Sequence, residues 1–158
     1  FGAALSPTSA WQILLGVETL PLHMAQHNAN AMAVAEYLQD DPRVAWVNYP
    51  GLASHPQHEL IKRQMSGASG LLAFGVKGGL AAGVKFIEGA QMMSHLVNIG
   101  DTRTLISHPA STTHRQLDEA QQIAAGVHPD MVRISVGLEH IDDILWDIDQ
   151  ALSAANTA

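Results

Sequence analysis

The chain has 158 residues, of which 47% are hydrophobic and 15% are charged, and its net charge is −7. This composition can build one domain with a sizeable core, and it excludes disordered and fibrous proteins. An acidic chain with only eight Lys and Arg residues matches a run of phosphates poorly, so no nucleic-acid partner is expected. The absence of cysteine excludes disulfides, thiol nucleophiles and Cys-ligated metal sites. No apolar run approaches the roughly 18 residues of a membrane span, and a cytoplasmic location is expected.

The first quarter of the sequence predicts two helices. Ser6 and Pro7 form a helix start, with serine as the cap and proline at the first helical position. Pro21 is expected to end or kink this helix, because proline lacks the backbone N–H that the helix interior needs. A second, alanine-rich helix is predicted from about Pro21 to Leu38.

The rest of the sequence predicts short strands that alternate with helices. Most strands carry apolar residues on one face only, which is typical of a sheet covered on one side. The fold class is therefore α+β, a mainly antiparallel sheet of four to five strands with helices packed on one side, in a single domain. The expected strands are 44–49, 70–77, 95–100, 102–107 and 131–136, and the expected helices are 57–65, 80–93, 115–126 and 141–152.

Arg133 is the sharpest single feature of the sequence. Val132, Ile134 and Val136 alternate with it, so Arg133 shares the opposite strand face with Ser135. A guanidinium stays charged and is costly to bury unless a carboxylate or phosphate pairs with it. Three readings stay open on the residues alone: a solvent-facing arginine, an ion pair within the chain, and a bound anionic ligand. The pattern favours anion binding over catalysis.

The nine histidines do not predict a metal site. His23 and His27 are four residues apart, and His55 and His58 are three apart, but no third ligand completes either pair. His23 and His27 are expected on a solvated or interface-facing side of their helix. A stretch of hydroxyl residues, 111–113, is expected to cap the helix after it, because no glycines flank a serine there as a hydrolase nucleophile requires. The glycines match no phosphate-binding loop, and none of the three lysines stands out as a Schiff-base residue.

Four stretches together resemble the Cys/Met-metabolism family of pyridoxal-phosphate (PLP) enzymes, which includes cystathionine synthases and lyases, methionine γ-lyase and homoserine-ester sulfhydrylases. The resemblance runs in order over essentially the whole chain, and within the family it is greatest to the O-acetylhomoserine sulfhydrylases. The stretches are GAALSPTSAWQILLGVETLPLHM (2–24), VNYPGL (47–52), NIGDTRTLISHPASTTH (98–114) and VRISVGLEHIDDIL (132–145).

The resemblance implies a fold-type I enzyme whose large N-terminal domain binds PLP and is absent from this chain. Residues 1–158 are then a single C-terminal domain, with helices in 1–38 linking to the large domain and an α+β core in 43–158. No catalytic, cofactor-binding or metal-binding residue is expected here, and the isolated chain is predicted to be inactive. A chain that begins FGAALSP without Met agrees with a piece of a longer protein, which the resemblance implies is a tetramer when intact.

The resemblance also implies three substrate-contacting residues. The arginine of the family's R-x-S-V-G motif falls on Arg133 and is expected to bind the α-carboxylate of the amino-acid substrate. Asn98, at a position that is often serine, is expected to help hold that carboxylate, and Thr113 of the H-P-A-S-x-T-H motif to lie near the substrate side chain. His23 departs from the arginine usual in the family's L-R-M, which puts any contact of that arginine in doubt.

The implied reaction is a γ-replacement, in which sulfide or a thiol displaces acetate from O-acetyl-L-homoserine to give homocysteine or methionine. Asn98 favours this synthesis over γ-elimination, because the lyases more often carry serine there. The alternatives are a methionine γ-lyase or cystathionine enzyme of the same family, and a non-catalytic module that self-associates.

Overall fold

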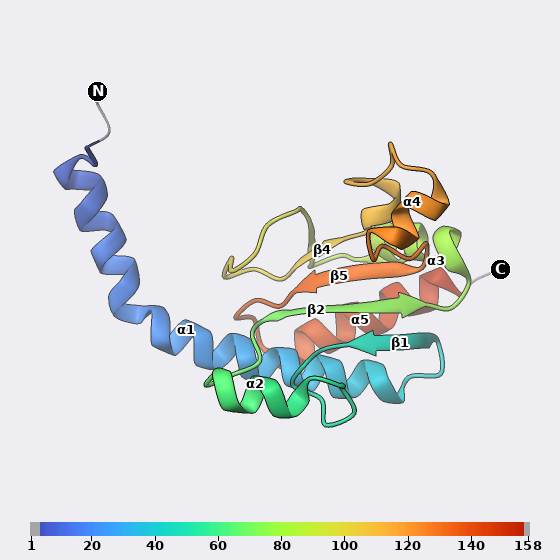
Figure 1. Ribbon diagram of the computed structural model, residues 1–158, viewed down its shortest axis with the longest axis horizontal. Coiled ribbons are helices and arrows are strands. Elements are labelled where there is room, and N and C mark those ends of the chain that lie inside the picture. The colour runs from blue at the N-terminus through green and yellow to red at the C-terminus, as the bar shows by residue number, and fades with distance from the viewer. Residues whose placement is uncertain (1–3, 157–158) are drawn as a thin grey trace.

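One five-stranded sheet organises residues 4–156, the part of the chain that this computed structural model describes (Figure 1). β3 pairs with β4 in parallel, and the other three pairs are antiparallel. The α+β class with a mainly antiparallel sheet is therefore confirmed. The strands are β1 (Val44–Asn48), β2 (Leu71–Val76), β3 (Ser94–His95), β4 (Leu105–Ser107) and β5 (Met131–Ser135), and they lie in the order β1-β2-β5-β4-β3.

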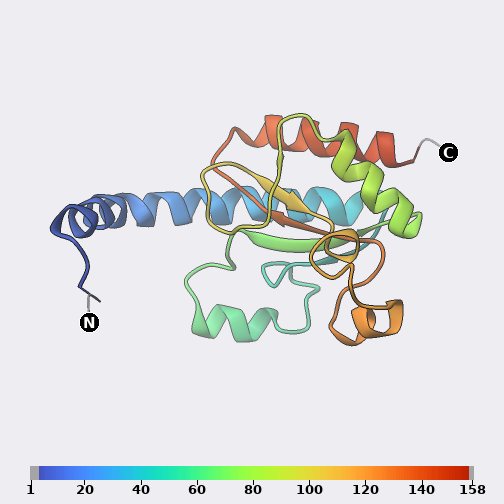
Figure 2. The ribbon, with the colours of Figure 1, turned by 90° about the horizontal axis from the view of Figure 1, so that it is seen from above.

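Three helices cover one face of this sheet, and the opposite face, called the open face below, is the side of the two short helices. The covering helices are α1 (Pro7–Asp40), α3 (Gly79–Gly89) and α5 (Ile141–Ala155), which contact the strands or one another. Figure 2 shows α3 and α5 on one side of the strands, and the short helices α2 (His58–Gln64) and α4 (Glu119–Ala124) on the other. The single 3₁₀ turn η1 (Pro109–Ser111) follows β4.

The core lies between the sheet and its three covering helices. Val132 and Ile134 of β5 point into it and are fully buried, as the alternation in the sequence predicts. Phe74 of β2 meets Phe86 of α3 edge to face, with ring centroids 5.4 Å apart. Each such buried side chain contributes roughly 1.5–3 kcal/mol to folding, so this face of the sheet stabilises the domain.

Residues 7–40 form one continuous helix, so the prediction of two helices is wrong. Ser6 caps its start, and the Ser9 N–H donates to the Ser6 hydroxyl at 3.1 Å. Pro21 lies inside the helix without ending it. The surrounding residues 11–22 are exposed, so water can reach the carbonyl that the proline leaves without a donor, and Figure 1 shows α1 changing direction along this exposed part.

The two halves of α1 differ in their surroundings. The C-terminal half packs against β1, β2 and α5, whereas the N-terminal half projects from the domain (Figure 1). Large apolar side chains are exposed there, with Trp11 59% and Leu22 72% accessible. Among the described residues, no helix combines the length and the apolar character that a bilayer crossing requires.

Three other elements end earlier than the sequence predicts. The strand expected at 95–100 stops at His95, and residues 96–100 form an exposed loop. The helix expected at 80–93 stops at Gly89, because the buried Asp147 carboxylate accepts the backbone N–H groups of residues 91–93 at 2.8–3.0 Å. The helix expected at 115–126 is only α4. Asp118 caps it in a capping box with Gln121, so the hydroxyls of residues 111–113 do not.

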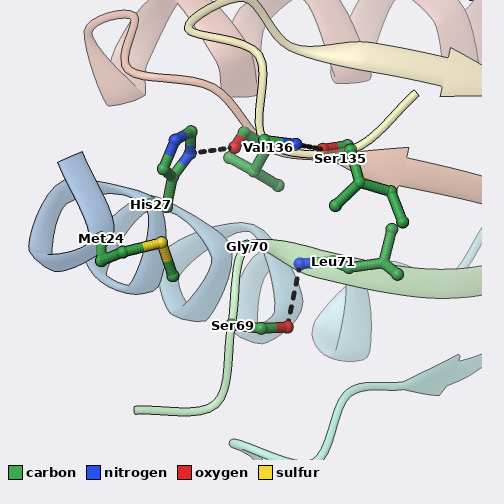
Figure 3. Close-up of a pocket in the computed structure, with 9 residues that line it drawn as sticks. Met24, His27, Ser69, Gly70, Leu71, Ser135 and Val136 are labelled. Carbon is green, nitrogen blue, oxygen red and sulfur yellow. Dashed lines mark hydrogen bonds between the residues drawn. The ribbon is translucent and has the colours of Figure 1, made fainter. Parts of the chain in front are cut away.

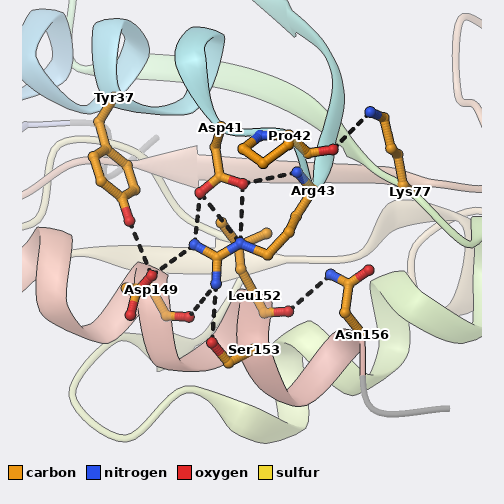
Figure 4. Close-up of polar contacts among 9 residues, drawn as sticks. All are labelled: Tyr37, Asp41, Pro42, Arg43, Lys77, Asp149, Leu152, Ser153 and Asn156. Carbon is orange, nitrogen blue, oxygen red and sulfur yellow. Dashed lines mark hydrogen bonds and ion pairs between the residues drawn. The ribbon is translucent and has the colours of Figure 1, made fainter.

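Arg43 joins the start of β1 to the end of α1 and to α5 (Figure 4). Its guanidinium donates to Asp41 and to Asp149, both at 2.6 Å, and to the Ser153 hydroxyl at 2.9 Å. The Tyr37 hydroxyl donates to the same Asp149 carboxylate at 3.1 Å. Hydrogen bonds from Arg43 lower the pKa of the Asp41 and Asp149 carboxyls below the usual 3.8.

Arg43→Ala is expected to lower the free energy of unfolding at pH 7 by about 1–2 kcal/mol, because it removes charge-assisted bonds to a largely buried Asp41. Since the folded pKa of Asp41 is depressed, this stabilisation is fully present above pH 3.8 and is lost as the pH falls through the folded value. Urea denaturation at pH 7 and at pH 3 measures both effects. Arg63→Ala, at an exposed position of α2, is the control, and equal losses in the two variants would contradict the role of Arg43.

Candidate functional site

Arg133 lies on the open face of the sheet, at the centre of β5. Its neighbours across the strands are small: Ala73 of β2 on one side and Ser107 of β4 on the other. The side chain is half-buried and lines a pocket of about 230 Å³ together with Asn48 and Met131. None of the ion pairs found within residues 4–156 includes Arg133. The reading of Arg133 as half of an internal ion pair is therefore excluded for the described part of the chain.

The exposed loop 96–100 places Asn98 beside Arg133. One guanidinium nitrogen of Arg133 donates to the backbone carbonyl of Asn98 at 3.2 Å. The side-chain oxygen of Asn98 accepts the Ile99 N–H at 2.9 Å, so its amide NH₂ group is available to donate to an anion. The structure therefore brings these two residues together, and the contact between them runs through the Asn98 backbone.

Ser135, two residues after Arg133 on β5, binds the same loop. Its hydroxyl accepts the Gly100 N–H at 3.3 Å, and Ser135 itself is buried. Gly100 has a φ of +78°, a left-handed conformation that glycine adopts without steric cost. The loop thus meets β5 at two successive open-face positions, Arg133 and Ser135.

Hydrogen bonds between Glu139 and Thr104 hold the turn 136–139 that follows β5. The Glu139 carboxylate accepts the Thr104 N–H at 2.6 Å and the Thr104 hydroxyl at 2.8 Å, and the same hydroxyl accepts the Gly137 N–H at 2.9 Å. A Cβ at Gly137 would lie 2.5 Å from the Thr102 carbonyl oxygen, so only glycine allows this close approach. These contacts explain why glycine stands at position 137 and glutamate at position 139.

Helix α1 holds the same turn from the other side. His27 donates from Nδ1 to the Val136 carbonyl at 2.6 Å, and Asn30 donates to the Gly137 and Glu139 carbonyls, both at 3.0 Å. His27 is only 5% exposed, so the expectation that it faces solvent or an interface is wrong. The sequence does contain a signal for this burial. His27 shares one face of the helix with Ala31 and Leu38, because of its spacing to them, and both of these residues are buried.

His27 also borders a mostly apolar pocket of about 260 Å³ between α1 and the loop (Figure 3). Met24 contributes to it from α1, Ile99 and Gly100 from the loop, and Ser135 from β5. The pocket therefore lies directly against the loop segment that meets Arg133.

Thr113 lies in the segment after η1, and within residues 4–156 no hydrogen bond joins it to Arg133. Its hydroxyl is within 2.8 Å of His114 Nδ1, and its side chain is exposed. His108 anchors this segment: Nε2 donates to the Pro129 carbonyl at 2.8 Å, which leaves Nδ1 to accept the Ser111 hydroxyl at 2.8 Å. The structure thus brings Arg133 and Asn98 together and leaves Thr113 separate.

The described residues offer neither a metal centre nor a lysine beside Arg133. Within residues 4–156, no three His, Asp or Glu side chains come together. Lys62 pairs with Glu59, Lys77 donates to the Pro42 carbonyl, and Lys85 is exposed on α3. The arrangement on the open face suits a planar carboxylate, which a guanidinium can hold through two parallel hydrogen bonds.

Comparison with known proteins shows the enzyme family to which the chain is related. The model of the Cys/Met metabolism PLP-dependent enzymes matches residues 1–153. The chain belongs to this family. O-acetyl-L-homoserine sulfhydrylase 1 of Thermus thermophilus is 50% identical over 153 residues, which cover 96% of this chain and 36% of that protein. L-methionine gamma-lyase of Pseudomonas putida is 46% identical over 154 residues, 98% of this chain and 39% of that protein.

A solved structure agrees with the fold as well as with the sequence. The crystal structure of a Campylobacter jejuni protein provisionally named O-acetylhomoserine (thiol)-lyase, which contains a pyridoxyl-lysine phosphate residue, matches with a TM-score of 0.88 and 41% identity. The match covers 96% of this chain and 36% of that one. This member of the PLP-dependent family therefore spans little more than a third of the length of the relatives it matches.

The pH dependence of stability tests the buried His108. Burial lowers the pKa of His108 below 6.5, so the folded protein keeps the ring neutral where the unfolded chain protonates it. The stabilisation is present above pH 6.5 and is lost as the pH falls below that value. The free energy of unfolding, measured by urea denaturation, is expected to fall more steeply between pH 7 and pH 5 in the original chain than in His108→Gln. Equal slopes would contradict the buried neutral ring.

Proposed function

We propose that this chain is the C-terminal, substrate-binding domain of a PLP-dependent O-acetylhomoserine sulfhydrylase. The proposed reaction is γ-replacement, in which sulfide or a thiol displaces acetate from O-acetyl-L-homoserine and gives homocysteine or methionine. The proposal takes residues 1–158 as one domain, with 1–38 leading to a large N-terminal domain and 43–158 as the α+β core. The 50% identity to a named sulfhydrylase supports this branch of the family.

The single observation that carries the proposal is the state of Arg133. It is half-buried on the open face, it borders a pocket, and no carboxylate of the described residues pairs with it. A guanidinium in such a place is stabilised when an anion arrives. The α-carboxylate of an amino acid has the planar shape that two parallel N–H groups of Arg133 can hold.

The neighbouring residues support the same ligand. Arg133 uses one donor on the Asn98 carbonyl and retains others for a carboxylate, because a guanidinium carries five N–H groups. The Asn98 amide supplies a further donor from the loop. With the carboxylate held at these two residues, the rest of the amino acid would be fixed in direction, and such orientation lowers a reaction barrier by several kcal/mol. Thr113 is proposed to lie near the substrate side chain.

The cofactor is proposed to bind to the N-terminal domain of the intact enzyme. This part of the proposal is supported by the exposure of all three lysines, since a Schiff-base lysine is desolvated beside its cofactor. We therefore propose that the isolated chain is inactive and that its own residues serve to hold the substrate. The intact enzyme is proposed to be cytoplasmic and tetrameric.

A methionine γ-lyase is the second candidate, because a named γ-lyase is 46% identical over nearly the whole chain. The same carboxylate site would serve either enzyme, since both act on amino acids with similar backbones. A module that only self-associates is the remaining alternative. The exposed apolar side chains of the N-terminal half of α1 would favour association in that case.

Substitution of Arg133 in the complete polypeptide tests the carboxylate site. Arg133→Ala is expected to lower kcat/KM for O-acetyl-L-homoserine at least about 30-fold, because the charged contact with the carboxylate is lost at a half-buried position. Arg133→Lys should be less harmful but not neutral, because an ammonium cannot form two parallel bonds. Steady-state kinetics measure both, with Arg63→Lys on the exposed face of α2 as the matched control. An Arg133→Ala enzyme with unchanged KM and kcat would refute the site.

Product analysis separates the sulfhydrylase from the lyase. The complete, cofactor-loaded polypeptide is expected to convert O-acetyl-L-homoserine and sulfide to homocysteine, with a rate that depends on the sulfide concentration. A γ-lyase would instead release methanethiol, a 2-oxo acid and ammonia from methionine and water, without added thiol. Absence of homocysteine under these conditions would refute the sulfhydrylase assignment.

A further inference from the structure

We propose that Ser135 is a positioning residue for the substrate carboxylate, acting through the loop that carries Asn98. The inference rests on the proposed function, because it concerns the same carboxylate site. Ser135 and Arg133 are two residues apart on β5, so both side chains leave the open face of the sheet. Their contacts with the loop are adjacent, one at Gly100 and the other at Asn98.

The two contacts constrain one another. The Gly100 N–H to Ser135 bond fixes the loop two residues beyond Asn98, and the Asn98 carbonyl then lies 3.2 Å from the Arg133 guanidinium. The guanidinium is thereby held in one orientation before a ligand arrives. Pre-organisation of this kind raises affinity because less side-chain freedom is lost on binding. Ser135 itself is buried beneath the loop, so it acts on the carboxylate indirectly.

The far end of the loop is fixed independently. Thr104, at the entrance to β4, is held by the Glu139 carboxylate, and Leu96 donates to the Ile106 carbonyl at 3.2 Å. Between these ends, two hydrogen bonds join residues 97–100 to β5 in the described part of the chain, one with Arg133 and one with Ser135. Loss of the Ser135 hydroxyl should therefore free the middle of the loop without detaching it or opening the core.

The first variant is Ser135→Ala in the complete, cofactor-loaded polypeptide. The expected result is a KM for O-acetyl-L-homoserine raised about fivefold, the scale of one neutral hydrogen bond, with kcat changed less than twofold. In an Arg133→Ala background the same substitution should have no further effect on KM, because residues that act through one another are not additive. A residue that only stabilised the fold would give the same increase in both backgrounds, and that outcome would overturn the proposal.

A second variant tests the same hydrogen bond from the loop side. A Cβ at Gly100 would meet no atom of residues 4–156 within 4 Å, so Gly100→Ala acts only by straining a backbone with φ of +78°. It should raise KM to a similar extent and should not add to Ser135→Ala. Gly126 is the matched control, since it has φ of +80° and equally open surroundings within the described residues. Gly126→Ala should lower the melting temperature comparably and leave KM unchanged.

The outcomes separate the two proposals. If Arg133→Ala raises KM but Ser135→Ala and Gly100→Ala do not, the carboxylate site stands and the positioning role is overturned. If Arg133→Ala itself leaves KM unchanged, the carboxylate site fails and the proposed function fails with it. If Ser135→Ala does not fold, the Gly100→Ala and Gly126→Ala pair decides the question.

Discussion

The hydrogen bonds between Glu139 and Thr104 are the contact on which the open-face arrangement depends. They join the turn after β5 to the entrance of β4, across 35 residues of sequence. The Glu139 carboxylate uses both oxygens, one on a backbone N–H and one on a hydroxyl, so neither polar group is left without a partner in this crowded turn. With that turn fixed, β4 and β5 can pair in register, and the loop that precedes Thr104 has a fixed C-terminal end.

The two faces of the sheet serve different purposes. The covered face carries the apolar residues that stabilise the domain, including Phe74 and Ile134, and its helices are tied together by polar contacts such as those of Arg43 and Asp147. The open face carries small residues around a single arginine. Loops can change the shape of a site on this face without disturbing the core, because the helices on the covered face hold β5 in place.

Alternation and composition were sufficient to predict the fold class and the face on which Arg133 lies. Both are set by local periodicity and by burial of apolar side chains, which a sequence displays directly. Two helix boundaries that were predicted wrongly depend on the tertiary structure. Asp147 ends α3 from 54 to 56 residues away. Helix α1 continues through Pro21 because water can reach the carbonyl that the proline leaves without a donor. The partnership of Ser135 with Gly100, and the inward position of His27, likewise depend on tertiary contacts. The pairing of Arg133 with Asn98 came from family resemblance, because residues 35 positions apart reveal no contact by spacing.

The strand order also has a consequence for how the domain is made. β5 occupies the centre of the sheet, yet it follows all the other strands in the sequence. During synthesis, β1 can pair with β2 and β3 with β4, but nothing joins these two pairs until residues 131–135 emerge from the ribosome. Contacts of such long sequence separation form slowly, and until then the strand edges of β2 and β4 that β5 will occupy stay unpaired. The strand that carries Arg133 is thus also the one that completes the sheet, so a nascent chain gains the surroundings of Arg133 and the complete sheet in the same step.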